Sequence, residues 1–258
     1  MITGAASGLG AALARILAAE GWQLALVDLP AAEPALDGIV ADCPEAIIAG
    51  FDVRDAAGWT ALHDRLRAAW PALDLLVNAA GVGATGEVGR LPESQWRRVV
   101  DTNLVGTALG CETFLPWLRE HPGRSHLVNV ASIAGVIAPP SLAAYAASKA
   151  GVIALSEAIA AECRARRPGV TIVCPGFFRS GLLDTWHFTA ARESREARRR
   201  MNATGLDSAA VARRVRRAID RNERYVIEGL QARVLARLKR LAPRTTTALL
   251  HRLYRRLV

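Results

Sequence analysis

A tyrosine and a lysine four residues apart form the stretch of this sequence best suited to proton chemistry. The stretch, YAASK, covers residues 145–149. On a helix, residues four apart share a face, so the ammonium group of Lys149 would lie beside the phenol of Tyr145. Because a nearby cation favours the anionic form of a titrating group, we expect Lys149 to lower the pKa of Tyr145. Such a pair would exchange a proton with a carbonyl or an alcohol.

The choice of lysine supports this interpretation. Of the 33 basic residues, only Lys149 and Lys239 are lysines, and the rest are arginines. A compact ammonium group, not a planar guanidinium fork, is therefore selected at position 149. The alternative is a chance pair on an ordinary helix, since Y-x-x-x-K is a short pattern. The other motifs of the chain decide between the two.

Composition indicates one globular α/β domain. The chain has 258 residues, of which 51% are hydrophobic, enough for a sizeable core. Since it contains neither a long apolar run nor a signal-peptide pattern, we expect a cytoplasmic protein without a transmembrane helix. Four cysteines without C-x-x-C spacing predict buried, reduced thiols, and five scattered histidines predict no metal site.

A glycine-rich loop opens the chain. Strand and helix patterns alternate after it, which predicts a parallel sheet with helices on both faces. The loop reads TGAASGLG (3–10) and is followed by an apolar helical stripe. Glycines let a backbone approach a pyrophosphate, which the amides of a helix N-terminus bind. Only three residues precede Gly4, so we expect a clipped first strand, from a misassigned start or a truncated chain.

Acidic and small residues end the next strands. The strand at 23–27 runs into Asp28, whose carboxylate would accept hydrogen bonds from an adenosine ribose. Leu29 follows it instead of an arginine, which favours NAD over NADP. The strand at 46–51 ends in Asp52-Val53, and the one at 73–77 runs into NAAG (78–81), where small residues let a ligand approach. The alternatives are a turn aspartate at 28 and a tight turn at 78–81.

Together these motifs resemble the short-chain dehydrogenase/reductase family. The matching pieces are TGAASGLG (3–10), Asp28, Asp52-Val53, NAAG (78–81), Asn103 in DTNL, Ser132 in VASIAG, YAASK (145–149) and Pro175-Gly176. Each motif is short, but the set is specific in its order and spacing over roughly residues 1–181. The resemblance implies a single doubly wound Rossmann-type domain at 1–229, with a parallel sheet of about seven strands.

The resemblance also implies a catalytic set. Its members are Asn103, Ser132, Tyr145 and Lys149. Ser132 would hold the substrate oxygen, Tyr145 would exchange the proton, and Lys149 would also touch the nicotinamide ribose. Asn103 falls inside an expected helix at 92–117, where asparagine is unfavourable. In the family it holds a water for proton relay.

A longer set is implied for the cofactor. Its members are Gly4, Ser7, Gly8, Leu9, Gly10, Asp28, Leu29, Asp52, Val53, Asn78, Ala79, Ala80, Gly81, Tyr145, Lys149, Pro175, Gly176, Phe178 and Ser180. Ser180 keeps a hydroxyl group where the family usually has threonine. Phe178 departs from the family, which usually has a small branched residue at that place.

Two further segments follow the motifs. Residues 181–204 are expected to form a substrate lid without strands, and their aromatic residues favour a lipophilic alcohol or ketone. Alternatively, these aromatic residues only anchor a loop. Residues 230–258 are expected to form two basic amphipathic helices broken at Pro243.

The charge of the chain is unevenly distributed. Residues 1–178 carry 13 basic and 17 acidic residues, a net of −4, and residues 179–258 carry 20 and 7, a net of +13. The basic tail would contact an anionic membrane peripherally, or pack as a helical hairpin on its own or a partner subunit. Because no nucleic-acid-binding motif and little aromatic interleaving accompany the charge, we expect no nucleic-acid partner.

The sequence therefore predicts an NAD-dependent oxidoreductase that interconverts a secondary alcohol and a ketone with a Ser-Tyr-Lys(-Asn) relay. The alternative is a catalytically silent dinucleotide-binding sensor or scaffold on the same fold. By resemblance to the family, we also expect a homodimer or homotetramer through helices at about 92–118 and 143–165.

Overall fold

A parallel sheet of seven strands forms the centre of the computed structural model, which describes residues 1–41, 43, 45–163 and 167–255. The strands are β1 Ile2–Thr3, β2 Ala25–Asp28, β3 Ile47–Gly50, β4 Leu75–Asn78, β6 His126–Val130, β7 Gly169–Pro175 and β9 Tyr225–Glu228. Their order is β3-β2-β1-β4-β6-β7-β9, and every pair is parallel. The predicted doubly wound fold is confirmed.

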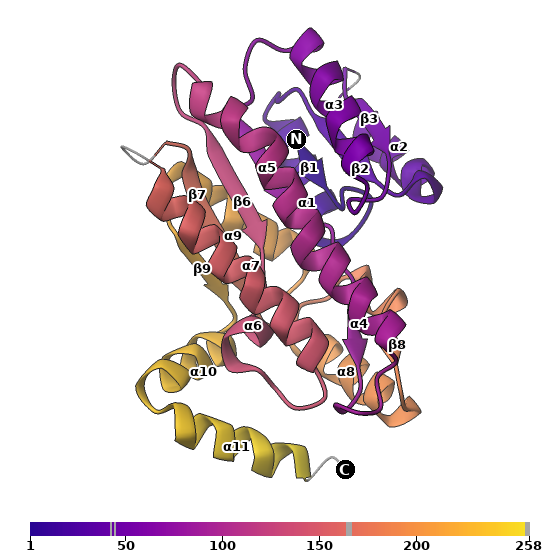
Figure 1. The fold of residues 1–258 in the computed structure, drawn as a ribbon, viewed down its shortest axis with the longest axis vertical. Coiled ribbons are helices and arrows are strands. Elements are labelled where there is room, and N and C mark those ends of the chain that lie inside the picture. The colour runs from indigo at the N-terminus through magenta and orange to yellow at the C-terminus, as the bar shows by residue number, and fades with distance from the viewer. Residues whose placement is uncertain (42, 44, 164–166, 256–258) are drawn as a thin grey trace.

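Helices cover both faces of this sheet (Figure 1). Helices α1 Gly8–Ala19 and α9 Ser208–Asp220 pack on one face, together with the short α2 Asp37–Val40 and the 3₁₀ turn η1 Pro30–Leu36. Helices α3 Ala56–Ala69, α5 Gly106–Glu120 and α7 Ala143–Glu162 pack on the other. Their apolar stripes bury Leu13 and Leu17 on the first face and Trp59, Phe114 and Trp117 on the second. The core is thus divided by the sheet into two layers.

The strand order reverses at β1, which has β2 on one side and β4 on the other. In such sheets the crevice beyond the carboxyl ends of the strands, at this reversal, is where ligands bind. The glycine loop leaves β1 there and the NAAG turn leaves β4. The Thr3 hydroxyl oxygen joins them by accepting hydrogen bonds from the amides of Ala79, at 3.1 Å, and Ala80, at 3.2 Å.

The helix expected at 92–117 consists of three pieces. Helix α4 Glu93–Val100 passes through a π-helical turn, η2 Asp101–Val105, into α5. Asn103 therefore lies in the π turn, not in a regular helix interior. Its carbonyl oxygen accepts a hydrogen bond from the Thr107 hydroxyl at 2.8 Å. Such π turns are frequent at functional sites because they redirect a side chain.

The expected lid has more regular structure than the sequence predicted. It contains a 3₁₀ turn, η4 Gly181–Asp184, then strand β8 His187–Phe188, then helix α8 Ala191–Ala203. Strand β8 pairs in parallel with β5 Ala84–Thr85. The prediction of a segment without strands was wrong, because pairing with a strand distant in sequence creates β8.

Two helices follow β9, with the predicted break at Pro243. They are α10 Leu230–Leu241 and α11 Pro243–Arg255. The buried side of α10 packs against the short helix α6 Ile133–Ile137, and the pair forms one end of the molecule (Figure 1). Among the described helices, none has both the length and the apolar character needed to cross a membrane. All four cysteines are buried and free, as predicted.

Candidate active site

Ser132, Tyr145 and Lys149 meet at the carboxyl end of β6. Ser132 begins helix α6 two residues after β6, and its hydroxyl oxygen accepts the Ala134 amide hydrogen at 3.1 Å. Tyr145 and Lys149 lie one turn apart in the first half of α7. The three side chains are almost completely buried, and the Ser132 hydroxyl lies close enough to Tyr145 to act on its pKa. The arrangement places a phenol, a hydroxyl and an amine around one enclosed position.

Burial dominates the electrostatics of this group. It raises the pKa of Tyr145 to about 12, although the Ser132 hydrogen bond acts to lower that pKa. Burial also lowers the pKa of Lys149 to about 8. The expected lowering of the tyrosine pKa by Lys149 is therefore not observed here. The lysine Nζ donates instead to the Val130 carbonyl at 2.7 Å and lies 5.9 Å from the centre of the Tyr145 ring. Because burial raises its pKa, the phenol holds its proton at neutral pH and can act as a proton donor.

Asn103 is fully buried and holds neighbouring parts of the site together. Its Nδ2 donates to the Val82 carbonyl at 2.9 Å and to the Ser148 hydroxyl at 3.0 Å, and its Oδ1 accepts the Val82 amide at 2.8 Å. Ser148 lies on α7 between Tyr145 and Lys149. The structure thus gives the Asn103 side chain a positioning role, fixing α7 against the segment that follows the NAAG turn.

The expected lid segment covers Tyr145 with an aromatic ring. The Trp186 ring centre lies 4.9 Å from that of Tyr145, with the planes inclined by 53°. The Trp186 Nε1 donates to the Thr85 hydroxyl at 2.8 Å. A Cβ atom at Gly83 would lie 2.2 Å from the indole, so only glycine leaves room for it. Trp186 was predicted as a lid residue, but not as the residue that covers Tyr145.

The glycine loop forms a cradle for a phosphate-bearing ligand. Gly4 and Gly8 have φ angles of 65° and 54°, which favour glycine. A Cβ atom at Gly10 would lie 2.1 Å from the Gly4 carbonyl oxygen, so the chain packs too closely there for any other residue. Ser7 precedes α1 without capping its amides through the side chain. With Leu9, these residues leave the first-turn amides of α1 available to an anion.

Asp28 lies at the end of β2, beside this loop. Its two carboxylate oxygens accept the amides of Ala6 and Leu29, each at 2.8 Å. Leu29 is half exposed. Because a carboxylate has further acceptor sites, the oriented Asp28 group can still accept hydrogen bonds from vicinal hydroxyls.

Asp52 and Val53, the next two predicted cofactor residues, have partners of their own. Asp52 forms an ion pair with Arg54 at 2.6 Å, and the hydrogen bond from Arg54 is the main reason that its pKa is lowered. Val53 is buried, and its carbonyl accepts the Trp59 Nε1 at 2.7 Å. The Val53 side chain therefore belongs to the core. The negative charge of Asp52 is balanced by Arg54.

The NAAG turn presents backbone to the crevice, while its asparagine side chain is turned inward. Asn78 is buried and its Nδ2 donates to Asn129 Oδ1 at 2.9 Å. A Cβ atom at Gly4 would lie within 3 Å of the Ala79 and Ala80 backbone, so the glycine loop and this turn are in close contact. A Cβ atom at Gly81 would lie 3.1 Å from Asn103 Oδ1 and 3.4 Å from Lys149 Nζ, which places Gly81 between the two.

The segment after β7 closes the crevice on the lid side. Pro175 ends β7, and the Gly176 amide donates to the Glu228 carbonyl of β9. Phe178 packs against the core layer of α1 and α9, so this departure from the family pattern contributes to packing. The Ser180 hydroxyl is buried, and no hydrogen-bond partner for it is found among the described residues. A buried hydroxyl of this kind fits a polar ligand group.

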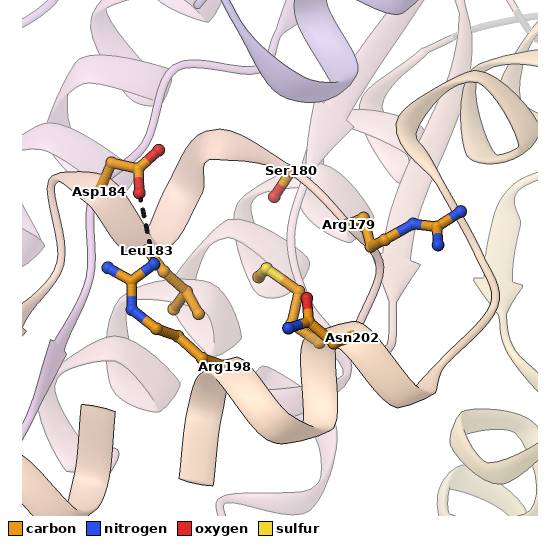
Figure 2. A pocket seen from close by; sticks show the side chains of 7 residues that line it. Arg179, Ser180, Leu183, Asp184, Arg198 and Asn202 are labelled. Carbon is orange, nitrogen blue, oxygen red and sulfur yellow. Dashed lines mark ion pairs between the residues drawn. The ribbon is translucent and has the colours of Figure 1, made fainter. Parts of the chain in front are cut away.

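A small cavity of about 190 Å³ lies beside Ser180, between η4 and α8. Figure 2 shows the Ser180 hydroxyl on its wall, the Asp184–Arg198 ion pair at 3.6 Å, and the Arg179 guanidinium pointing away from that pair. Its volume is below the roughly 300 Å³ of typical ligand pockets. Ser180 connects it to the glycine loop, since a Cβ atom at Gly8 would lie 3.6 Å from Ser180 Cβ.

Two functional contributions were missed in the sequence. Thr3 fixes the NAAG turn to the glycine loop, and Ser148 connects Asn103 to helix α7. Both residues lie within the quoted motifs, so their hydroxyl groups were the available signal. Neither pairing could be read from spacing, because each joins segments far apart in the sequence.

The comparisons with known proteins agree with this geometry. The family model described as short chain dehydrogenase matches residues 1–189. "Probable oxidoreductase EphD" of Mycobacterium tuberculosis is 35% identical over 196 residues, which cover 73% of this chain and 32% of the relative. The chain thus spans about a third of the length of that relative.

Two further similarities extend over most of both chains. 2-Dehydro-3-deoxy-L-rhamnonate dehydrogenase (NAD(+)) of a Sphingomonas species is 35% identical over 185 residues, covering 71% of this chain and 73% of the relative. The crystal structure of a Burkholderia phymatum short chain dehydrogenase/reductase in complex with NAD has a TM-score of 0.87 and 30% identity, covering 93% of this chain and 91% of that one. The chain belongs to the short-chain dehydrogenase family.

Proposed function

We propose that the protein is an NAD-dependent oxidoreductase that interconverts a secondary alcohol and a ketone. The observation that carries the proposal is the enclosed group of Ser132, Tyr145 and Lys149. Two similar proteins support the choice of cofactor, since one is named as an NAD(+) dehydrogenase and the other contains NAD.

The cofactor would be held by residues already described. The first-turn amides of α1 would bind its pyrophosphate, Asp28 its adenosine ribose and Ser180 its carboxamide or pyrophosphate. The close approach of Gly4 and Gly10 and the buried, unpartnered Ser180 hydroxyl fit this ligand. When bound, a nicotinamide ring supplies or accepts the hydride.

The side chains of Ser132, Tyr145 and Lys149 would carry out the proton transfer. For a ketone, the Ser132 hydroxyl would hold the carbonyl oxygen while the Tyr145 hydroxyl donates its proton to that oxygen as the carbon receives hydride. For an alcohol, the same oxygen returns the proton to the tyrosine anion. Lys149 would stabilise that anion, because an ammonium group acts over a short distance in a buried, low-dielectric site.

This arrangement argues against the silent sensor or scaffold. Burying an amine and a phenol costs free energy that a purely structural site avoids by using apolar residues. Here both groups are buried one helical turn apart on α7, with the buried Ser132 nearby. A catalytic role explains why the chain retains this costly group.

The lid supports a lipophilic substrate. The Trp186 indole lies over Tyr145, and the Phe188 ring centre is 6.3 Å from the indole. The neighbouring buried residues Leu91 and Val99 belong to the same apolar cluster. A substrate that displaces the indole from Tyr145 would meet mainly apolar walls, which favour an apolar group beside the reacting carbon.

The test of this function is a screen of lipophilic secondary alcohols with NAD, following the absorbance of the reduced cofactor. We expect turnover of a subset of these alcohols and of the matching ketones in the reverse direction. Tight NAD binding measured by calorimetry, with no turnover of any compound in either direction, would instead favour the scaffold.

We further propose that the protein assembles as a homodimer or homotetramer through α5 and α7. Alanines at 147, 150, 154, 158 and 161 form an exposed small-residue stripe along α7, and Val105 is 41% exposed just before α5. Such a surface suits close helix packing in a four-helix contact.

The expected result for assembly is at least a dimer at micromolar concentration in multi-angle light scattering. Ala154→Arg should shift the population to monomer, because a charge would be buried in the contact. Ala61→Arg, at an exposed alanine of α3, is the matched control and should leave the mass unchanged. A monomeric parent protein would contradict the proposal.

A further inference from the structure

Helix α10 carries an apolar stripe that faces away from the rest of the chain. Leu230, Val234 and Leu241 are 74%, 54% and 83% exposed. At 100° per residue these positions fall within about 40° of one another. The opposite side of the helix holds the buried Ala232 and Ala236. The stripe is therefore not part of the packing of α10 against α6.

Arginines accompany this stripe. Arg237 lies about 20° beyond its edge, next to Leu230, and Arg233 and Arg240 lie farther along the same flank. The exposed arginines of both tail helices are Arg233, Arg237, Arg240, Arg244, Arg252 and Arg255. For the residues that the structure describes, none of these six guanidinium groups has a carboxylate within ion-pair distance. Their positive charge is directed at solvent.

Helix α11 adds to the same end of the molecule. Leu249 and Leu253 are 38% and 45% exposed. Tyr254 anchors this helix: its hydroxyl donates to Glu87 at 2.6 Å and accepts from Ser141 at 2.8 Å. Leu249 and Leu253 are thus not fully buried inside the fold and remain available to an external apolar surface.

We propose that the tail surface, defined as Leu230, Val234, Leu241, Leu249, Leu253 and the six arginines above, binds an anionic membrane surface peripherally. Exposed leucines can enter the interfacial region while guanidinium groups remain among the lipid headgroups. Each arginine near an anionic bilayer adds to the affinity, and the apolar contact adds independently of salt.

Other occupants fit this surface less well. A two-fold contact with a second copy would bring the same uncompensated guanidinium groups together, where they repel. Nucleic acid would use the arginines but would give the exposed leucines no apolar partner. An anionic bilayer matches both the charge and the apolar stripe.

The position of the tail relates this surface to the lid. Glu87, which receives the Tyr254 hydrogen bond, follows strand β5, and β5 pairs with the lid strand β8. A membrane-bound chain would hold its lid side near the bilayer, where lipophilic substrates partition. Only this link to the substrate rests on the proposed function, because the binding itself needs no activity.

The experiment is co-sedimentation of the full chain with vesicles. It measures membrane binding and does not depend on enzymatic activity. One set contains phosphatidylcholine alone and the other contains about one third phosphatidylglycerol. We expect binding to the second set, weakened but not abolished by salt, and little binding to the first.

Two triple variants separate the contribution of the apolar residues from that of the arginines. The apolar variant combines Leu230→Ser, Val234→Ser and Leu241→Ser. The charge variant combines Arg233→Gln, Arg237→Gln and Arg240→Gln. We expect the first to weaken vesicle binding about tenfold and the second about a hundredfold at low salt. The control combines Arg213→Gln, Arg217→Gln and Arg221→Gln, which are exposed on α9 and directly after it and remove the same charge elsewhere.

Several results would overturn the proposal. One is equal sedimentation of the parent and both tail variants, or no sedimentation of any. Another is an equal loss in the control variant, which would indicate non-specific attraction by net charge. Binding to random-sequence DNA, without vesicle binding, would assign the surface to nucleic acid. A lower mass of the apolar variant in light scattering, without vesicle binding by the parent, would assign it to self-association.

Discussion

Tyr145→Phe should reduce kcat about a thousandfold, which corresponds to about 4 kcal/mol in the activation barrier. The variant removes one hydroxyl group, the proposed proton donor, and keeps the ring that packs beneath Trp186. Because burial raises the pKa of the phenol and keeps it uncharged at neutral pH, its loss removes a proton donor and not a charge. The measurement is steady-state turnover of an active substrate identified by the screen.

Tyr225→Phe is the matched control. It makes the same chemical change at a tyrosine of β9, whose hydroxyl bonds Glu157 outside the site. This control should keep parental turnover, and both variants should keep parental NAD affinity in a fluorescence titration. A Tyr145→Phe enzyme with near-normal kcat would remove Tyr145 from the proton transfer.

The second large effect concerns the cofactor. We expect kcat/KM to be about a hundredfold higher with NAD than with NADP. The Asp28 carboxylate is held by two backbone amides and cannot turn away without losing both hydrogen bonds. A 2′-phosphate would therefore meet a fixed negative charge, and repulsion at about 4 Å costs roughly 1–4 kcal/mol near a protein surface.

Replacing this carboxylate tests the explanation. Asp28→Ser should reduce the NAD to NADP ratio of kcat/KM to about ten or less, since the repulsion is removed. Asp64→Asn changes the charge by the same amount at an exposed position of α3 and should leave the ratio unchanged. A parent enzyme that prefers NADP would contradict the role of Asp28.

The part of the site that the sequence predicted well is set by strand order. Ser132 lies two residues after β6, and Tyr145 and Lys149 lie on α7, between β6 and β7. Once the sheet is parallel and the strands are in sequence order around β1, these residues must lie at its carboxyl edge. Local patterns were enough to place them.

The parts that the sequence did not predict depend on contacts between distant segments. The π turn at Asn103 is tied to hydrogen bonds with Val82 and Ser148. The Lys149 ammonium group donates to the Val130 carbonyl, a contact that helical spacing does not predict. Strand β8 exists only through β5. No periodicity in one segment encodes such pairings, because the partner lies elsewhere in the chain.

The indole that covers Tyr145 also has a kinetic consequence. Gly83 packs against the Trp186 ring and Thr85 accepts its Nε1 hydrogen bond, so we expect the ring to leave the phenol together with the lid segment. In the proposed enzyme this movement would occur twice in every turnover, once to admit the alcohol and once to release the ketone. Lid motions take microseconds to milliseconds and commonly limit kcat. The kcat of the proposed enzyme would then depend on solvent viscosity and not on the strength of the carbon–hydrogen bond.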